Sequence, residues 1–99
     1  MTEVLLEAKA KLTWTKPILD IFEKAYARSE NPLVPDLKRR CYQYLTEILY
    51  RLEVGHITQD IAFLAILGCA RAFLCPLTPM ELREIGKILG TFIEIGKTW

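Results

Sequence analysis

The sequence predicts an all-α fold: a compact bundle or orthogonal array of about five helices around a buried central helix at 59–74. Proline and glycine divide the 99 residues into segments of helical length, and apolar residues recur in them every three or four positions. The uncharged run from Ile61 to Ala70 is apolar on every face, which is typical of a helix buried on all sides. A chain of this length is expected to form a single helical domain, 1–99.

The first two expected helices cover 3–12 and 15–28. The first is short and weakly amphipathic, so it must dock on other helices to be stable. Thr15 can cap the second helix, whose first turn tolerates Pro17. Prolines 32 and 35 then indicate a loop, because the residue before a proline is disfavoured in helical geometry.

The third expected helix begins at Pro35, carries Asp36 at its positive end and stops at Gly55, a residue suited to a left-handed helix end. The fourth, which is the central helix of the prediction, follows the N-cap residue Thr58 and ends before Pro76. Its alanines and its glycine would allow neighbouring helices to pack closely.

The fifth expected helix has the clearest start signal in the chain, Thr78-Pro79-Met80-Glu81. This pattern is a capping box with proline at the first helical position. Within the helix, Gly86 and Gly90 are four residues apart and so lie on one face. Because glycine weakens a helix interior by roughly 1 kcal/mol relative to alanine, the pair predicts a close helix crossing, with helix 59–74 or with a second copy.

Composition and charge exclude several function classes. The net charge of +1 gives the whole chain no general attraction to nucleic acid or to an anionic membrane. No apolar run approaches the roughly 20 residues that cross a bilayer, and the acidic start does not resemble a signal peptide. The odd number of cysteines, three, predicts reduced thiols in an apolar core and hence a cytoplasmic, reducing compartment.

Residues for catalysis or metal binding are few. His56 is the only histidine and Ser29 the only serine, and both fall in expected loops, so no base–nucleophile pair is indicated. Cys69 and Cys75 are spaced unlike a zinc motif and lack further ligands. We therefore expect a protein that is not an enzyme and that holds no metal and no cofactor.

A basic cluster, Lys38, Arg39 and Arg40, occupies the start of the third helix, where the helix dipole disfavours cations. Tyr42 follows it, and interleaved basic and aromatic residues are used to bind single-stranded nucleic acid. Three interpretations remain open: a solvated turn whose charge Asp36 offsets, a site for an acidic protein, and a site for a nucleic-acid backbone.

The leading hypothesis is a non-enzymatic helical module that binds another protein, with self-association through the fifth helix left open. Accessory proteins of viral or phage origin are among the classes that fit. The alternative is a small helical subunit of a nucleoprotein complex that contacts the nucleic-acid backbone. The partner-binding candidates are Lys38, Arg39, Arg40, Tyr42, Gly86, Ile88, Gly90, Phe92, Ile95 and Trp99.

Overall fold

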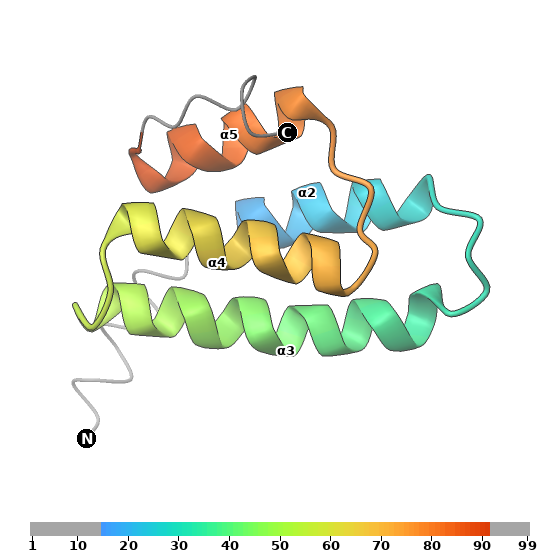
Figure 1. The fold of residues 1–99 in the computed structure, drawn as a ribbon, viewed down its shortest axis with the longest axis horizontal. Helices are drawn as coiled ribbons and strands as arrows, with labels where there is room; N and C mark the ends of the chain where they lie inside the picture. The colour runs from blue at the N-terminus through green and yellow to red at the C-terminus, as the bar shows by residue number, and fades with distance from the viewer. Residues whose placement is uncertain (1–14, 92–99) are drawn as a thin grey trace.

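The computed structural model describes residues 15–91, and in this part of the chain all regular structure is helical. The elements, labelled as in Figure 1, are α2 (Thr15–Ala27), α3 (Val34–Glu53), α4 (Gln59–Ala72) and α5 (Pro79–Leu89). Successive helices run in opposite directions, so the four form an up-down-up-down bundle (Figure 1).

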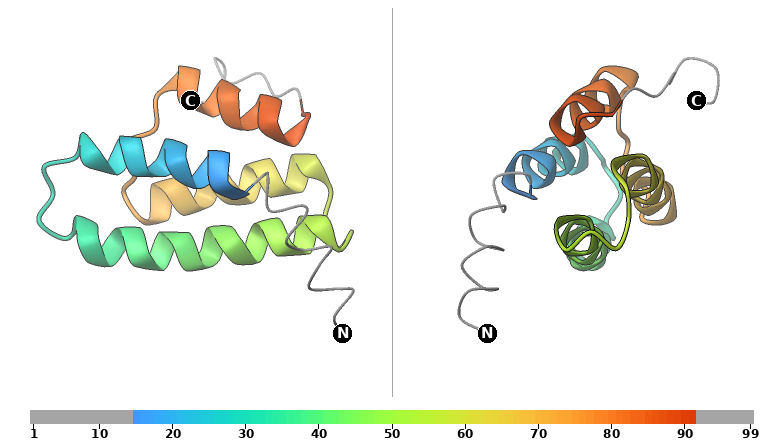
Figure 2. Two further views of the ribbon diagram at one scale, coloured as in Figure 1. Left: turned by 180° about the vertical axis from the view of Figure 1, so that it is seen from behind. Right: turned by 90° about the vertical axis from the view of Figure 1, so that its left-hand side faces the viewer.

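The four helices are arranged as a ring around one apolar core. Each packs mainly on two others: α3 lies between α2 and α4, and α5 closes the ring by contacting both α4 and α2. The end-on view in Figure 2 shows α2 and α4 on opposite sides, with α3 below and α5 above. The core contains buried side chains from all four helices and from the α4–α5 loop, among them Ile18, Phe22, Tyr26, Cys41, Leu45, Leu49, Phe63, Ile66, Leu77, Leu82 and Ile85.

The prediction of about five helices is corrected to four within the described residues. The first expected helix, 3–12, lies outside them, and the expected fifth helix, which was to include Gly90, ends at Leu89. That end is set by Gly90, which has a φ of 73° and occupies the left-handed position of a helix terminus.

The start signals of α4 and α5 and the stop signal of α3 are confirmed, whereas Thr15, expected as an N-cap, is the first helical residue of α2, and α3 begins at Val34, one residue before Pro35. The hydroxyl of Thr58 accepts a hydrogen bond from the Ile61 amide, and Thr78 and Glu81 form both hydrogen bonds of a capping box. Gly55 has a φ of 81° directly after the α3 C-cap. Each of these residues satisfies helix-end groups that would otherwise lack partners.

The prediction that helix 59–74 is a buried central helix is wrong. Ile61 and Leu64 are 52% and 59% exposed, whereas Phe63 and Ile66 on the opposite face are 1% exposed. A helix in a four-membered ring touches two neighbours, so only part of its circumference can be covered. The apolar character of α4 on its other side is therefore not explained by the packing of the described residues.

The end of α4 also differs from the expectation. The helix stops at Ala72, and the chain reverses at Leu74, whose φ is 53°. The Cys75 amide donates to the Ala70 carbonyl and the Leu74 amide to the Arg71 carbonyl, the hydrogen-bond pattern of a helix end that usually uses glycine. Leucine in this conformation costs roughly 1–2 kcal/mol, and no glycine marked the site in the sequence.

Polar side chains connect the helix ends at one pole of the bundle. The hydroxyl of Tyr26, at the end of α2, donates to the Phe73 carbonyl at 2.7 Å. Arg28 binds both carboxylate oxygens of Glu81 at 2.5 and 3.0 Å and also donates to the Pro76 carbonyl. Because Glu81 belongs to the capping box of α5, this ion pair fixes the start of α5 against the end of α2.

Two alanine substitutions on α4, at Ile66 and at Leu64, test which side of this helix is buried. Ile66→Ala removes a fully buried side chain and should lower the free energy of unfolding by about 2–5 kcal/mol. Leu64→Ala, on the exposed side, should change it by less than about 1 kcal/mol. Urea denaturation of both variants measures the difference, and equal losses would show that α4 is buried on both sides.

A second prediction concerns the ion pair between Arg28 and Glu81. The hydrogen bonds from Arg28 lower the pKa of the Glu81 carboxyl, so the carboxylate stabilises the fold at neutral pH. This contribution is lost as the pH falls below about 4.3, the ordinary pKa of glutamate, because the group then takes up a proton more readily in the unfolded chain.

Glu81→Gln should therefore lower the Tm at pH 7, and the difference from the parent protein should shrink between about pH 5 and pH 3. Glu84→Gln, an exposed change in the same helix, is the matched control and should show a smaller effect. A Tm difference for Glu81→Gln that is independent of pH would contradict the ion-pair explanation.

Candidate functional site

The outward face of α4 is both apolar and exposed. Its residues follow the helical period and point away from both neighbouring helices. We define this α4 face as Ile61, Leu64, Ala65, Gly68 and Ala72. Ile61 and Leu64 belong to the exposed large hydrophobic residues, whereas Ala65 is half-buried.

Gly68 is the least constrained glycine of the four in the described residues. Gly55 and Gly90 have positive φ angles, and a Cβ at Gly86 would meet the Phe63 ring at 3.5 Å. A Cβ at Gly68 would meet no atom within 4 Å, and the residue has an ordinary helical φ. The fold of the described chain therefore does not need a glycine there, although glycine weakens the helix by roughly 1 kcal/mol relative to alanine.

Two charged residues lie along one edge of the α4 face. At 100° per residue, Asp60 and Arg71 differ by only about 20° around the helix axis. Asp60, in the first turn, accepts a short hydrogen bond from the Thr91 hydroxyl, and Arg71 is in the last turn. The edge is thus negative at the beginning of the helix and positive at its end, which also suits the helix dipole.

Apolar surface continues beyond the end of α4. Leu74, in its left-handed conformation, is 58% exposed. Tyr44 of α3 is also exposed, and its ring lies 5.4 Å from the Phe73 ring, centroid to centroid. Sequence reasoning missed this surface because it assigned the whole of 59–74 to the core.

The basic cluster is exposed and has acidic partners. Arg39 and Arg40 both contact the Asp36 carboxylate, at 2.9 and 3.3 Å, and Lys38 lies 3.4 Å from Glu23 of α2. The structure therefore supplies the charge compensation that the solvated-turn interpretation expects. Surface pairs of this kind contribute little to stability, typically 0 to about 1 kcal/mol each.

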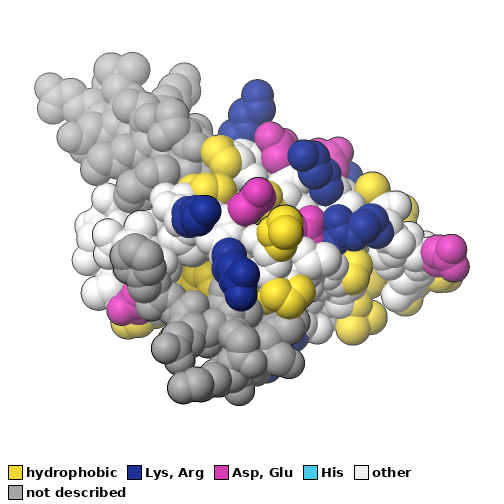
Figure 3. Space-filling view, turned by 90° about the horizontal axis from the view of Figure 1, so that it is seen from above, with side chains coloured by type: hydrophobic (Ala, Val, Ile, Leu, Met, Phe, Trp, Pro, Cys, Tyr) yellow, Lys and Arg dark blue, Asp and Glu magenta, His cyan; other side chains and the backbone are white. Residues whose placement is uncertain are grey.

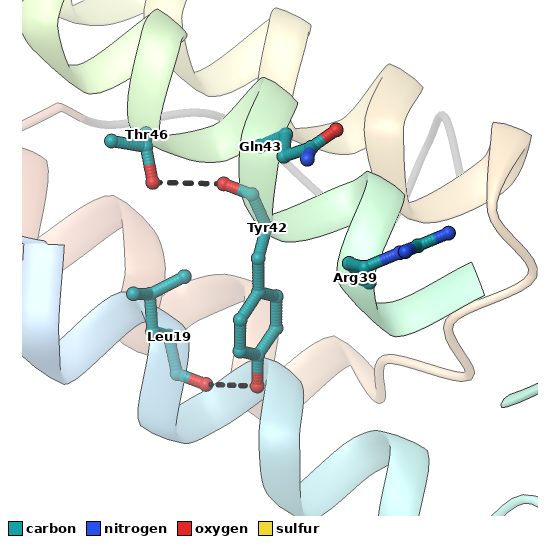
Figure 4. A pocket seen from close by; sticks show the side chains of 5 residues that line it. All are labelled: Leu19, Arg39, Tyr42, Gln43 and Thr46. Atoms are coloured by element: carbon teal, nitrogen blue, oxygen red, sulfur yellow. Dashed lines mark hydrogen bonds between the residues drawn. The ribbon is translucent and has the colours of Figure 1, made fainter. Parts of the chain in front are cut away.

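Tyr42 is half-buried at the contact between α3 and α2. Its hydroxyl donates to the Leu19 carbonyl at 3.1 Å, which links α3 to α2 (Figure 4). The Lys38 amine lies 5.7 Å from the centroid of the Tyr42 ring. The ring borders an open, mostly apolar hollow of about 550 Å³. Burial raises the pKa of the Tyr42 hydroxyl, so it stays protonated and keeps its hydrogen bond at physiological pH.

The candidates on the expected fifth helix are placed in different environments. Gly86 is buried against Phe63 of α4, which agrees with the crossing between these two helices. Gly90 is the C-cap residue of α5, so the expectation that both glycines lie on one face within the helix is wrong. Ile88 is half-buried against the core, and Phe92, Ile95 and Trp99 lie outside the described residues.

The three thiols are buried and protonated. Burial raises the pKa of Cys41 to about 11 and that of Cys75 to about 12, and it raises the pKa of Cys69 as well. A protonated thiol is a poor nucleophile and a poor metal ligand. Within residues 15–91, no group of three or more His, Cys, Asp or Glu side chains is placed to hold a metal ion.

The face of the molecule shown in Figure 3 carries mixed charge. Over the described part of the face in Figure 3, basic and acidic side chains alternate with apolar ones, and neither sign forms a large patch. None of the described helices is both long and apolar enough to cross a membrane.

Comparisons with protein-family models, with curated proteins and with solved structures return no match to this chain.

Three glycine-to-alanine substitutions test these environments. Gly68→Ala should raise the free energy of unfolding by about 1 kcal/mol, because the methyl group enters open space and alanine favours the helix. Gly90→Ala should lower it by about 1–2 kcal/mol, because the residue keeps a positive φ. The free energy of unfolding of Gly86→Ala should fall between those of the other two, since the new methyl group meets the Thr91 carbonyl oxygen at 3.4 Å and the Phe63 ring at 3.5 Å.

Chemical denaturation at low protein concentration measures all three variants. A loss of stability for Gly68→Ala at that concentration would contradict the assignment of this glycine to an open helix surface.

Proposed function

We propose that this chain is a non-enzymatic helical module that binds another protein through the α4 face. The observation that carries the proposal is the exposure of Ile61 and Leu64 beside a glycine that the fold does not require. Exposed apolar residues gathered on one helix face are typical of interaction sites, whereas single exposed leucines are not informative.

Helix-on-helix binding is the recognition mode that this surface favours. The α4 face offers apolar residues at i, i+3, i+4, i+7 and i+11, the spacing with which one helix contacts another. Glycine and alanine at the middle and end of the face allow a close approach, while Ile61 and Leu64 supply the apolar side chains that anchor it. Binding would bury the surface that the ring of α2 to α5 leaves open.

The conformation of Leu74 adds support. A leucine with positive φ is unfavourable, and Leu74 is 58% exposed, so its burial offsets little of that cost. Unfavourable backbone conformations are found preferentially at functional sites. Leu74 is close to the end of the α4 face along the chain, so one partner could contact both.

The nucleic-acid alternative has less support. It depends on the basic cluster and Tyr42. The basic side chains already form ion pairs with Asp36 and Glu23, and the Tyr42 hydroxyl already donates a hydrogen bond to the Leu19 carbonyl. Phosphate binding would have to compete with those contacts. The test below therefore includes a position in the basic cluster.

Site-specific crosslinking in cells that naturally express the chain tests the proposal. A photoreactive amino acid is placed at position 64 on the α4 face, at 39 in the basic cluster, or at 80. Met80 is 73% exposed on α5 and serves as the matched control. We expect a discrete protein adduct from position 64 and none from position 80.

Adducts with nucleic acid from position 39, with no protein adduct from position 64, would favour the alternative instead. A protein captured at position 64 is then titrated against the purified chain, and Leu64→Glu should weaken its binding at least 10-fold while Met80→Glu leaves the binding unchanged. Equal effects of the two substitutions would contradict a role for the α4 face.

A further inference from the structure

We infer that the partner of the α4 face is a second copy of this chain, bound so that the two α4 helices run antiparallel. The inference rests on the proposed function, because it names the occupant of the same surface. Its basis is that the α4 face is complementary to itself in size and in charge when it is turned by a two-fold axis.

The size complementarity follows from the order of residues along α4. Large residues, Ile61 and Leu64, occupy the first half of the face, and small ones, Gly68 and Ala72, occupy the second half. A two-fold axis passing through the level of Ile66 places Leu64 opposite Gly68 of the second copy. The same axis places Ile61 within one residue of Ala72 of the second copy, so each large side chain faces a small one.

The charge complementarity comes from the edge that carries Asp60 and Arg71. In an antiparallel helix pair, the same edge of both helices meets across the two-fold axis. With the axis at Ile66, Asp60 of one copy lies almost level with Arg71 of the second copy. The two positions differ by one residue, about 1.5 Å along the helix. Two symmetric ion pairs result, at positions that already suit the dipole of each helix.

The absence of a side chain at Gly68 is explained by the same arrangement. A Cβ at this position meets nothing in its own chain, but it would occupy the space into which Leu64 of the second copy inserts. The contact extends along 14 residues, about 21 Å, which is short for a permanent interface. We therefore expect an equilibrium between monomer and dimer in the micromolar range or weaker.

The oligomeric state of the full chain is measured by sedimentation velocity from about 1 µM to about 1 mM. We expect the parent protein to shift from monomer to dimer within this range. Gly68→Leu should weaken the association at least 10-fold and leave the circular-dichroism spectrum and the Tm of the dilute protein close to those of the parent. Arg83→Glu, an exposed charge reversal on α5, is the control and should leave the association unchanged.

Charge reversal tests the antiparallel geometry itself. Asp60→Lys alone places two like-charged pairs across the axis, and so does Arg71→Glu alone, so each variant should dimerise at least 10-fold more weakly than the parent. When the two variants are mixed, both pairs become attractive, and a heterodimer should form. In a parallel pair, Asp60 would lie level with Asp60 and Arg71 level with Arg71, so neither single reversal would add a like-charged pair or weaken the dimer relative to the parent.

A parent protein that stays monomeric up to 1 mM, or a mixture of the two variants that does not associate, would overturn the inference. The proposed function fails separately. If position 64 captures a different protein while the chain remains monomeric, the α4 face is an interaction site and self-association is wrong. If position 64 captures no protein at all, including a second copy, the proposed function is wrong as well.

Discussion

The bundle depends on the contact between α2 and α5, because this contact closes the ring of helices. The other neighbouring pairs, α2 with α3, α3 with α4 and α4 with α5, are consecutive in sequence and are joined by loops, whereas α2 and α5 are separated by two helices. Arg28 makes the connection by binding the Glu81 carboxylate and the Pro76 carbonyl together. It acts together with the Tyr26 hydroxyl, which ties the Phe73 carbonyl at the end of α4 to the end of α2.

Local signals in the sequence predicted most of the helix limits. Thr58, Thr78 and Gly55 act on their own helix ends, so their roles do not depend on the rest of the fold. The end of α4 was not predictable in this way, because Leu74 adopts a conformation that its residue type disfavours. The burial of α4 was overpredicted for a different reason. An apolar helix face is expected to be shielded from water, but its sequence does not show whether the same chain or a partner buries it.

The candidate site was therefore hidden within a segment that the sequence assigned to the core. The two glycines of the expected fifth helix were interpreted as a binding surface. In the structure, Gly90 ends α5 and Gly86 packs against Phe63 of α4. Gly68 was interpreted as packing space for neighbours within the chain, and only the structure shows that no side chain of residues 15–91 packs against it. Pairing of the basic cluster with Asp36 could be read from sequence, whereas the contact between Lys38 and Glu23 requires the α2–α3 packing.

The buried thiols have a practical consequence for the dynamics of the molecule. Cys41 lies on α3, Cys69 on α4 and Cys75 in the loop before α5, and all three are shielded from solvent and protonated at neutral pH. A thiol reagent can reach each of them only when the surrounding helices separate, so the alkylation rate at each site reports a local opening event. The native chain thus carries one chemical probe for each of three adjoining segments, without any engineered label.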